Sequence, residues 1–220
     1  MKLDRQTLLL PVLLAAALAS LSACAPLIVG GAAVGAMAYF DRRTSGTQVE
    51  DETIELRAAS RVREAIPAGH INVTSYNRQV LITGEVPSEQ AKQTAGDVAS
   101  KVENVKGIVN ELAVAINTSL SNRSSDTLIT GQVNASFLDE KKLYSGAFKV
   151  VTERGIVYLM GRVTKAEADL ATQIARGVSG VQRVVRIFEI LSDEELRQLA
   201  AQGAAVPAPA KPASPASGAR

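Results

Sequence analysis

The chain has 220 residues, of which 24 are Lys or Arg and 22 are Asp or Glu, so its formal net charge at pH 7 is only +2. The cations are not clustered, which argues against nucleic acid as a partner because phosphate binding needs grouped positive charges. The single cysteine, Cys24, excludes an intrachain disulfide, and the single histidine, His70, has no second histidine or thiol nearby in sequence with which to form a metal site.

The first 23 residues have the pattern of a targeting segment. Lys2 and Arg5 form a basic start, an apolar stretch runs from Leu8 to Ala19, and the letters LSAC end at Cys24. The apolar stretch is too short to span a bilayer. LSAC resembles the lipobox of bacterial lipoproteins, which implies that residues 1–23 are a lipoprotein signal peptide and that Cys24 is lipidated. An ordinary secretory signal with an incidental cysteine is the alternative.

The resemblance to bacterial lipoproteins also implies a location. Those lipoproteins are retained in the inner membrane by an aspartate after the lipidated cysteine, whereas here Ala25 follows Cys24. We therefore expect a triacylated protein, with palmitate among its acyl chains, that is anchored by lipid in the outer membrane and faces the periplasm.

Two further segments have compositions that do not suit a packed core. Residues 25–40 are apolar and rich in Gly and Ala but shorter than the ~20 residues of a membrane-spanning helix, so we interpret residues 24–46 as a tether. A short buried hairpin or an interfacial segment is the alternative for residues 25–40. Residues 203–220 are rich in Pro and Ala and contain no aromatic residue, so they should be disordered.

The sequence between these segments repeats itself. NVTSYNRQVLITGEV, from Asn72 to Val86, aligns without a gap with KVVTERGIVYLMGRV, from Lys149 to Val163. Both copies therefore have the predicted order α, β, β, α, β. The other elements predicted for the two copies are the opening helices at 52–66 and 126–138, the second helices at 88–102 and 164–178, and the closing strands at 105–116 and 181–190.

This order predicts an α+β fold made of two tandem two-layer sandwiches, each with two helices on one face of a small mixed sheet. The first domain is expected at 47–120, the second at 121–191, and a C-terminal helix at 192–202. A domain of ~70 residues is marginally stable alone, so the two domains are expected to pack together.

The two units resemble BON domains, in which a Gly-x-Val pattern precedes the second helix and a V-x-G-V-x-x-V pattern follows it. The resemblance covers residues 41–191 and is closest to the dual-BON outer-membrane lipoproteins that are associated with division, outer-membrane stress and lipid binding. The segments that carry it are DRRTSGTQVEDETIELR (41–57), INVTSYNRQVLITGEVP (71–87), SDTLITGQV (125–133) and ARGVSGVQRV (175–184).

Residues that could carry catalysis are sparse. His70 lies in PAGHINV and is interpreted as a solvated loop histidine. The acidic letters SDEEL at 192–196 are typical of the first turn of a helix that is capped by Ser192. Gly84 and Gly161 precede helices but belong to no glycine-rich nucleotide motif, so we expect them to serve backbone geometry. The sequence thus predicts a protein that is not an enzyme and has no metal or cofactor.

The opening helix of the second unit has two apolar faces. Ile129, Val133 and Phe137 form the expected core face, and the opposite face of the first unit's helix is charged and suited to water. In the second unit that opposite face is uncharged, and basic residues follow it directly. A cover formed by the first unit or by the tail is the alternative to an exposed binding surface. The residues predicted to contact phospholipid are Leu128, Gly131, Ala135, Leu138, Lys141 and Lys142.

The resemblance to the dual-BON lipoproteins implies that this helix binds anionic phospholipid, such as phosphatidylglycerol or cardiolipin. It also implies that the protein supports outer-membrane integrity and envelope stress tolerance, with division sites as one place of action. The second domain has more basic than acidic residues, which favours an anionic surface. The rival hypothesis is an adaptor that docks a protein of the envelope-assembly or cell-wall machinery on the helix face or on the strand edge at 187–190.

Overall fold

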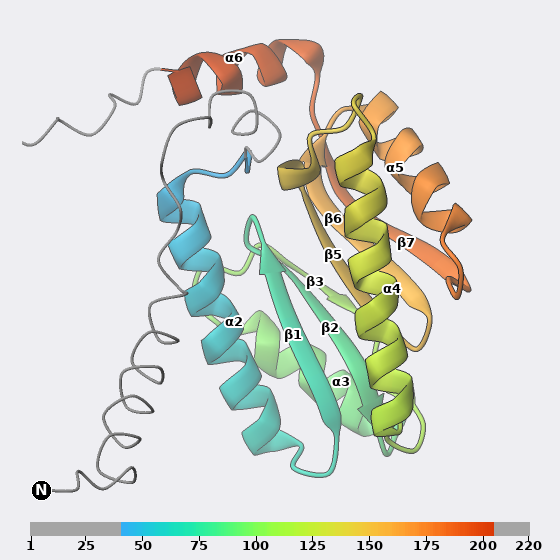
Figure 1. Cartoon of the computed structure of the whole chain (residues 1–220). Helices are drawn as coiled ribbons and strands as arrows, with labels where there is room; N and C mark the ends of the chain where they lie inside the picture. Colours follow the sequence, from blue (N-terminus) through green and yellow to red (C-terminus); the bar gives the residue numbers. More distant parts are fainter. Residues whose placement is uncertain (1–40, 205–220) are drawn as a thin grey trace, which may run out of the picture. The chain divides into compact units, whose positions relative to one another are not determined.

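The computed structural model describes residues 41–204, which contain both repeats (Figure 1). The signal peptide, the lipidated Cys24, residues 25–40 of the tether and residues 205–220 of the tail lie outside the described residues. Within the described range, no helix has the length and apolar character needed to cross a membrane.

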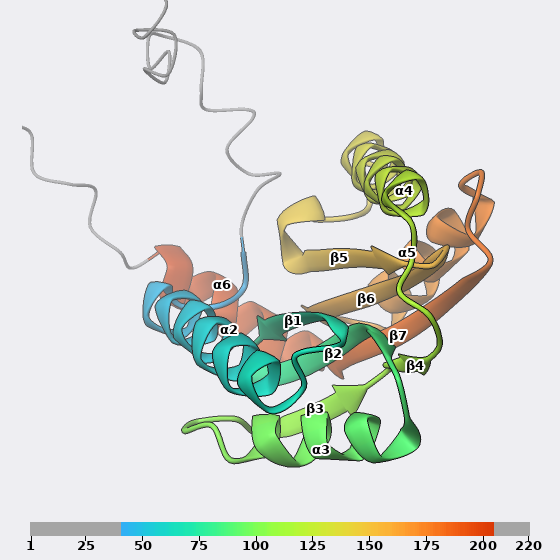
Figure 2. The same cartoon turned by 90° about the horizontal axis from the view of Figure 1, so that it is seen from below.

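The first repeat has the predicted order of elements, and its sheet has the strand order β1-β2-β3. Strand β2 pairs antiparallel with β1 and parallel with β3, and its end pairs parallel with the short strand β4. Helices α2 and α3 lie on one side of this sheet (Figure 2). The elements are α2 (Ser45–Ala65), β1 (His70–Tyr76), β2 (Gln79–Val86), α3 (Glu89–Ser100), β3 (Gly107–Asn110) and β4 (Ala113–Val114).

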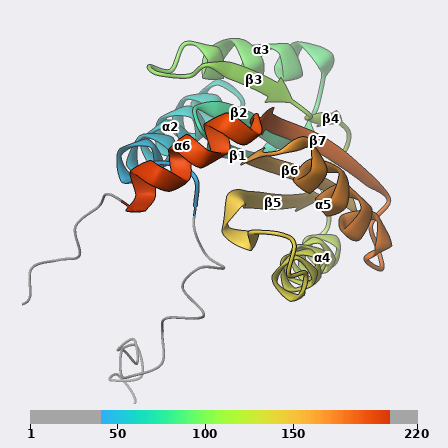
Figure 3. The ribbon, with the colours of Figure 1, turned by 90° about the horizontal axis from the view of Figure 1, so that it is seen from above.

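The second repeat has the same plan, with the strand order β5-β6-β7. Strand β6 pairs antiparallel with β5 and parallel with β7, and the helices α4 and α5 cover one side of the sheet (Figure 3). The predicted α+β fold of two tandem BON-like units is therefore confirmed. The elements are α4 (Leu120–Asp139), η3 (Ser145–Ala147), β5 (Phe148–Glu153), β6 (Ile156–Val163), α5 (Lys165–Gly177), β7 (Arg183–Ile190) and a final helix α6 (Asp193–Ala204).

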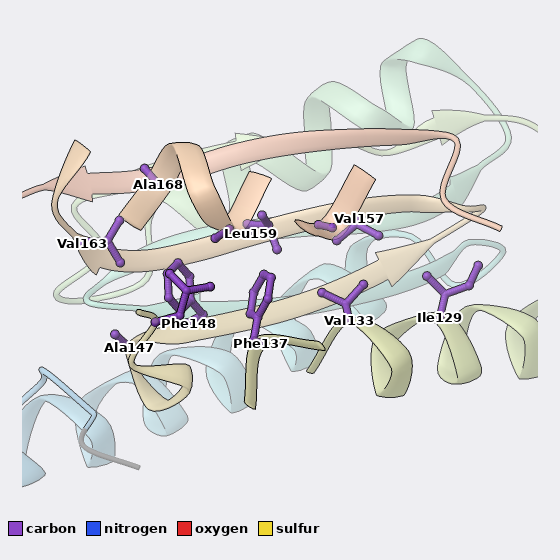
Figure 4. Close-up of a cluster of buried hydrophobic side chains, with 12 residues drawn as sticks. Ile129, Val133, Phe137, Ala147, Phe148, Val157, Leu159, Val163 and Ala168 are labelled. Carbon is purple, nitrogen blue, oxygen red and sulfur yellow. The ribbon is translucent and has the colours of Figure 1, made fainter. Parts of the chain in front are cut away.

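The core of the second repeat forms between α4, α5 and the sheet. Ile129, Val133 and Phe137 of α4 are buried, and the Phe137 ring lies 5.1 Å from that of Phe148 between ring centroids (Figure 4). Ala171 and its neighbours on α5 are small, which lets this helix approach the sheet closely. The stripe at i, i+4 and i+8 of α4 is thus the core face, as the sequence predicts.

The reverse faces of the two sheets form a third apolar cluster. Because successive side chains of a strand point to opposite faces, Leu81 of β2 points away from α2 and α3, as Tyr158 and Met160 of β6 point away from α4 and α5. These three residues pack with Tyr76 in one buried cluster, and the Tyr76 hydroxyl donates to the Ala147 carbonyl. The two small domains therefore stabilise each other through their sheets, as expected from their size.

Each repeat fixes its hairpin by an aspartate of the opening helix. The Asp51 carboxylate accepts hydrogen bonds from the backbone N–H groups of Asn77 and Arg78, both of which have positive φ. The Asp126 carboxylate accepts in the same way from Arg154 and Gly155. Positive φ at both central residues is the geometry of a tight two-residue hairpin turn, so the carboxylate stabilises the turn that sets the strand register.

Several element boundaries differ from the sequence prediction. Helix α4 begins at Leu120 behind the N-cap Ser119, well before the predicted start at 126. Helix α2 begins at Ser45 behind Thr44, so the predicted boundary between the tether and the first domain at 46/47 falls inside a helix. Serines and threonines near these helix starts suit either a cap or a first turn, which explains the errors.

The first closing strand is also shorter than predicted, because it is divided into β3 and β4. Asn110, the last residue of β3, turns its side chain to the Lys92 carbonyl and accepts a hydrogen bond from the Leu112 amide. These bonds interrupt the pairing with β2 in the segment that connects β3 to β4.

Candidate lipid-contact surface of helix α4

The outward face of α4 exposes large apolar side chains. Leu128 is 67% exposed and Leu138 is 58% exposed, and Gly131 and Ala135 between them are also exposed. Apart from its chain neighbours and the backbone of its own helix, a Cβ atom at Gly131 would have no heavy atom within 4 Å, which shows how open this face is. No described part of the chain covers these residues, so the alternative of a face covered by the first repeat does not hold.

The apolar face extends further toward the N-terminus than the sequence predicts. Leu120, the first residue of α4, is 78% exposed. Leu120 and Leu138 are separated by a whole number of helical turns, which places the two side chains on the same side of the helix. The prediction misses Leu120 because it starts the helix too late, and the signal that could have found it is the N-cap Ser119.

Helix α4 carries few charges. Its charged residues are Arg123, Asp126 and Asp139, and Asp126 is buried against the β5–β6 turn. Helix α2 is richer in charge, but it also exposes Val49 and Leu56, by 65% and 68%. Arg57, Ser60, Arg61 and Glu64 are exposed, as expected of a face suited to water, and Leu56 is the apolar exception within the predicted helix. Exposed leucines occur on both α2 and α4, so they do not distinguish the two helices. The difference is that few charged residues surround the exposed leucines of α4.

Two lysines and a tyrosine lie where α4 ends. Lys141 and Lys142 are exposed, and within the described part of the chain neither forms an ion pair. Tyr144 is 50% exposed, and the guanidinium carbon of Arg42 lies 5.4 Å from its ring centroid. The end of the apolar helix face thus carries two lysines and an aromatic ring, together with Asp139 and Glu140, which lie between Leu138 and the lysines.

Arg42 ties the segment before α2 to the second repeat. Its guanidinium donates to both oxygens of Glu167, at 2.8 and 2.7 Å, and to the Arg162 carbonyl at 2.9 Å. Burial would raise the pKa of Glu167, but the hydrogen bonds from Arg42 and Thr164 outweigh it and lower that pKa. Glu167 also completes the capping box with Thr164 that opens α5. The chain therefore enters the folded part beside Tyr144, near the C-terminal end of α4.

His70 is not the solvated loop residue that the sequence indicates. It is the first residue of β1, its side chain is 19% exposed, and its Nδ1 lies at hydrogen-bond distance, 3.1 Å, from Oε2 of the buried Glu85. Burial would raise the pKa of Glu85, but hydrogen bonds from Thr118 and then from His70 lower it. Glu153 of β5 lies in the same cluster, and burial raises its pKa. These partners of His70 lie on other strands, one of them in the other repeat, so no local pattern could reveal them.

The two glycines that precede helices serve the backbone, as expected. A Cβ atom at Gly84, which has a φ of 112°, would lie 2.0 Å from the His70 carbonyl oxygen, and one at Gly161 would lie 2.6 Å from that of Ala147. Ser192 and Glu195 exchange the hydrogen bonds of a helix cap at the start of α6. Neither feature forms a binding site.

Comparisons with known proteins agree with this architecture. The BON domain model matches twice, at residues 50–116 and 125–191. Outer membrane lipoprotein DolP of Haemophilus influenzae is 38% identical over 174 residues, which cover 78% of this chain and 90% of that protein.

Two further relatives are similar over shorter stretches. The 21 kDa hemolysin of Actinobacillus pleuropneumoniae is 35% identical over 67% of this chain and 78% of its own length. Osmotically-inducible protein Y of Escherichia coli is 32% identical over 60% of this chain and 67% of its own length. None of these three names describes an enzyme. With two BON domains and extended identity to DolP, the chain belongs to the BON-domain family and is an outer-membrane lipoprotein of the DolP type.

Proposed function

We propose that the second repeat binds anionic phospholipid through the outward face of α4 and that the protein has no catalytic activity. The observation that carries the proposal is the exposed, apolar face formed by Leu120, Leu128 and Leu138, which is followed, after Asp139 and Glu140, by the exposed cations Lys141 and Lys142. Leucines on such a face can enter the boundary between head groups and acyl chains while lysines pair with anionic head groups.

The expected strength of this contact is modest. Full burial of a leucine side chain is worth about 1.5 to 3 kcal/mol, so each of these partly exposed leucines contributes about 1 to 2 kcal/mol. Each lysine adds about 1 kcal/mol near an anionic surface. A contact of this size is reversible and depends on lipid composition.

Anchoring therefore rests on the acyl chains. We propose that residues 1–23 are a signal peptide and that Cys24 carries the lipid, since two or more acyl chains already give stable attachment. The helix contact would then orient the second repeat on the membrane and favour anionic regions of it. Arg42 supports this arrangement, because the chain that follows the anchor segment enters the fold near the C-terminal end of α4.

This orientation suggests a role in keeping the outer membrane intact under envelope stress, including at sites of division where membrane composition and curvature change. Phosphatidylglycerol and cardiolipin are the lipids that the charges of Lys141 and Lys142 would favour. The balanced charge of the sequence does not favour nucleic acid as a partner.

Flotation of residues 41–220 with vesicles tests the proposal. Vesicles of phosphatidylcholine alone should carry little protein to the top of the gradient, and vesicles with phosphatidylglycerol or cardiolipin should carry much more. Raising the salt concentration should weaken the difference, because exposed charges are screened. Absence of binding at every lipid composition would refute the proposal.

A protein adaptor is the second candidate, and the position of β7 favours it. Among the described strands, β7 pairs with β6 alone, so one of its edges is open to another strand, and Ile190 at its end is 54% exposed. An extended segment of an envelope-assembly or cell-wall protein could pair with this edge. Failure of flotation together with capture of such a protein would favour the adaptor.

A further inference from the structure

Three side chains that bind metals in many proteins meet between the two repeats. His70 comes from β1, Glu85 from β2 and Glu153 from β5, and one nitrogen or oxygen atom of each lies within 4.8 Å of the others. The two carboxyl groups are buried, with relative exposures of 0% for Glu85 and 6% for Glu153. Strands β1, β2 and β5 are labelled in Figure 1.

Glu153 has little to compensate a negative charge. Its Oε2 accepts a hydrogen bond of 2.9 Å from Asn72, and among the described residues no donor bonds to Oε1 and no cation forms an ion pair with it. The acidic groups that act on it, Glu85 and Asp126, add repulsion, which His70 opposes. A carboxylate with one hydrogen bond and little contact with solvent is costly to hold in its charged form, so a cation at this place would offset part of that cost.

Glu85 is held more firmly. The Thr118 hydroxyl donates to its Oε1, and the Thr118 amide and His70 Nδ1 lie at 3.1 Å from its Oε2. One ligand of the cluster is thus fixed in place by its hydrogen bonds, while Glu153 Oε1 and His70 Nε2 make no hydrogen bond within the described residues. Ligands of metal ions are commonly oriented by such outer hydrogen bonds.

We propose that His70, Glu85 and Glu153 bind a divalent transition-metal ion, with Zn²⁺ as the ion that suits one imidazole nitrogen and two carboxylates best. Three atoms no more than 4.8 Å apart lie within about 2.8 Å of a common centre, so bonds of about 2.0 to 2.2 Å require inward shifts of at most roughly 0.8 Å. Side-chain rotation can supply such a shift. Harder ions such as Ca²⁺ want six or more oxygen ligands, which this cluster does not offer.

The ion would connect the two repeats. His70 and Glu85 belong to the first repeat and Glu153 to the second, so a bound ion would add a link between domains that already contact through an apolar cluster, hydrogen bonds and ion pairs. Binding to the folded state alone would then stabilise the pair of domains in proportion to the logarithm of the metal concentration.

Thermal melts of the full chain in detergent, purified with a tag that contains no histidine, test the proposal with zinc chloride as the probe. The melting temperature should rise by about 5 to 10 °C at a zinc concentration about 100 times the Kd. Glu153→Gln keeps the shape and the hydrogen bond to Asn72 but removes the charge. This variant should be at least as stable as the wild type without zinc and should lose the response to zinc.

The matched control is Glu189→Gln. Glu189 also joins the repeats, because it accepts a hydrogen bond from Asn77 of the first repeat while it pairs with Arg162 of its own repeat. It is not part of the His70 cluster, and its substitution should leave the zinc response unchanged. His70→Asn should abolish the response as Glu153→Gln does, and calorimetric titration should show one zinc ion per chain in the wild type and in Glu189→Gln but none in His70→Asn or Glu153→Gln. A wild type that does not respond to zinc, or a response that persists in both His70→Asn and Glu153→Gln, would overturn the proposal.

Discussion

The ion pair of Arg42 and Glu167 offers a sharp test of how the segment before α2 is held. Both side chains are nearly buried, with 8% and 10% of their surface exposed, and their closest contact is 2.7 Å. Arg42→Ala leaves Glu167 with a buried charge and also removes the bond to the Arg162 carbonyl. Loss of one partner of a buried pair costs about 3 to 5 kcal/mol, and slight exposure of both groups reduces our expectation to about 2 to 4 kcal/mol.

For a folded part of this size, each kcal/mol shifts the melting temperature by about 2 to 4 °C, so Arg42→Ala should lower it by about 5 to 15 °C. Melts followed by circular dichroism would measure this shift. Arg57→Ala is the matched control, since Arg57 pairs with Glu103 at 3.2 Å but both side chains are more than half exposed. Exposed pairs contribute about 0 to 1 kcal/mol, so the control should melt within about 2 °C of the wild type.

Glu167→Gln tests the ion pair with Arg42 separately from the helix cap of α5. Glutamine can still fill the N3 position of the capping box, so this variant should lose the ion pair while α5 keeps its start. If Arg42→Ala changes the melting temperature no more than Arg57→Ala does, the segment before α2 is not fastened to the second repeat in solution, and the chain does not enter the fold beside Tyr144.

The core, the turns and the anchor each give a further prediction. Val133→Glu should unfold the second repeat, seen as loss of the cooperative melt, because an unpaired buried carboxylate costs several kcal/mol against a total of about 5 to 15. Asp51→Asn should lower stability at pH 7 by about 1 to 3 kcal/mol. Burial would raise the pKa of Asp51, but hydrogen bonds lower it in the folded state, so the stabilisation by the Asp51 carboxylate is present above pH 3.8 and is lost as the pH falls through the folded-state pKa. The melting temperatures of Asp51→Asn and the wild type should therefore converge at low pH. A difference that stays constant with pH would count against a stabilising role of the Asp51 carboxylate. Cys24→Ala should remove the protein from outer-membrane fractions, and a variant that resists a high-salt wash would show that another segment anchors the chain.

The two-layer units can be predicted from the sequence because their signals are local. Strand alternation, the helix stripes and the cap at Thr164 each depend on residues within one or two turns of each other, and all of them agree with the structure. Gly84 and Gly161 are predicted correctly as backbone positions for the same reason, since each marks a close approach of neighbouring strands.

The features that the sequence does not predict depend on contacts between distant residues. Asp51 and Asp126 bind the same turn in their repeats, but the sequence offset between these two residues is slightly smaller than the offset between the aligned strands. The offsets differ because the connection between the opening helix and the hairpin has a different length in each repeat. An alignment without gaps therefore hides their common role. Arg42 and Glu167, and likewise His70 and Glu153, meet only when the two repeats come together, and no pattern within either repeat records that meeting.

Vesicle flotation of the double variant Leu128→Glu/Leu138→Glu beside Leu56→Glu tests whether the outward face of α4 contacts the membrane. Leu56 on α2 is 68% exposed and Leu128 on α4 is 67% exposed, so the substitutions differ in location and not in accessibility. Loss of about 1 to 2 kcal/mol per leucine should weaken binding of the double variant to anionic vesicles at least about tenfold, while Leu56→Glu binds like the wild type and all three proteins melt alike. Equal weakening by Leu56→Glu, or undiminished binding by the double variant, would contradict a membrane contact through α4.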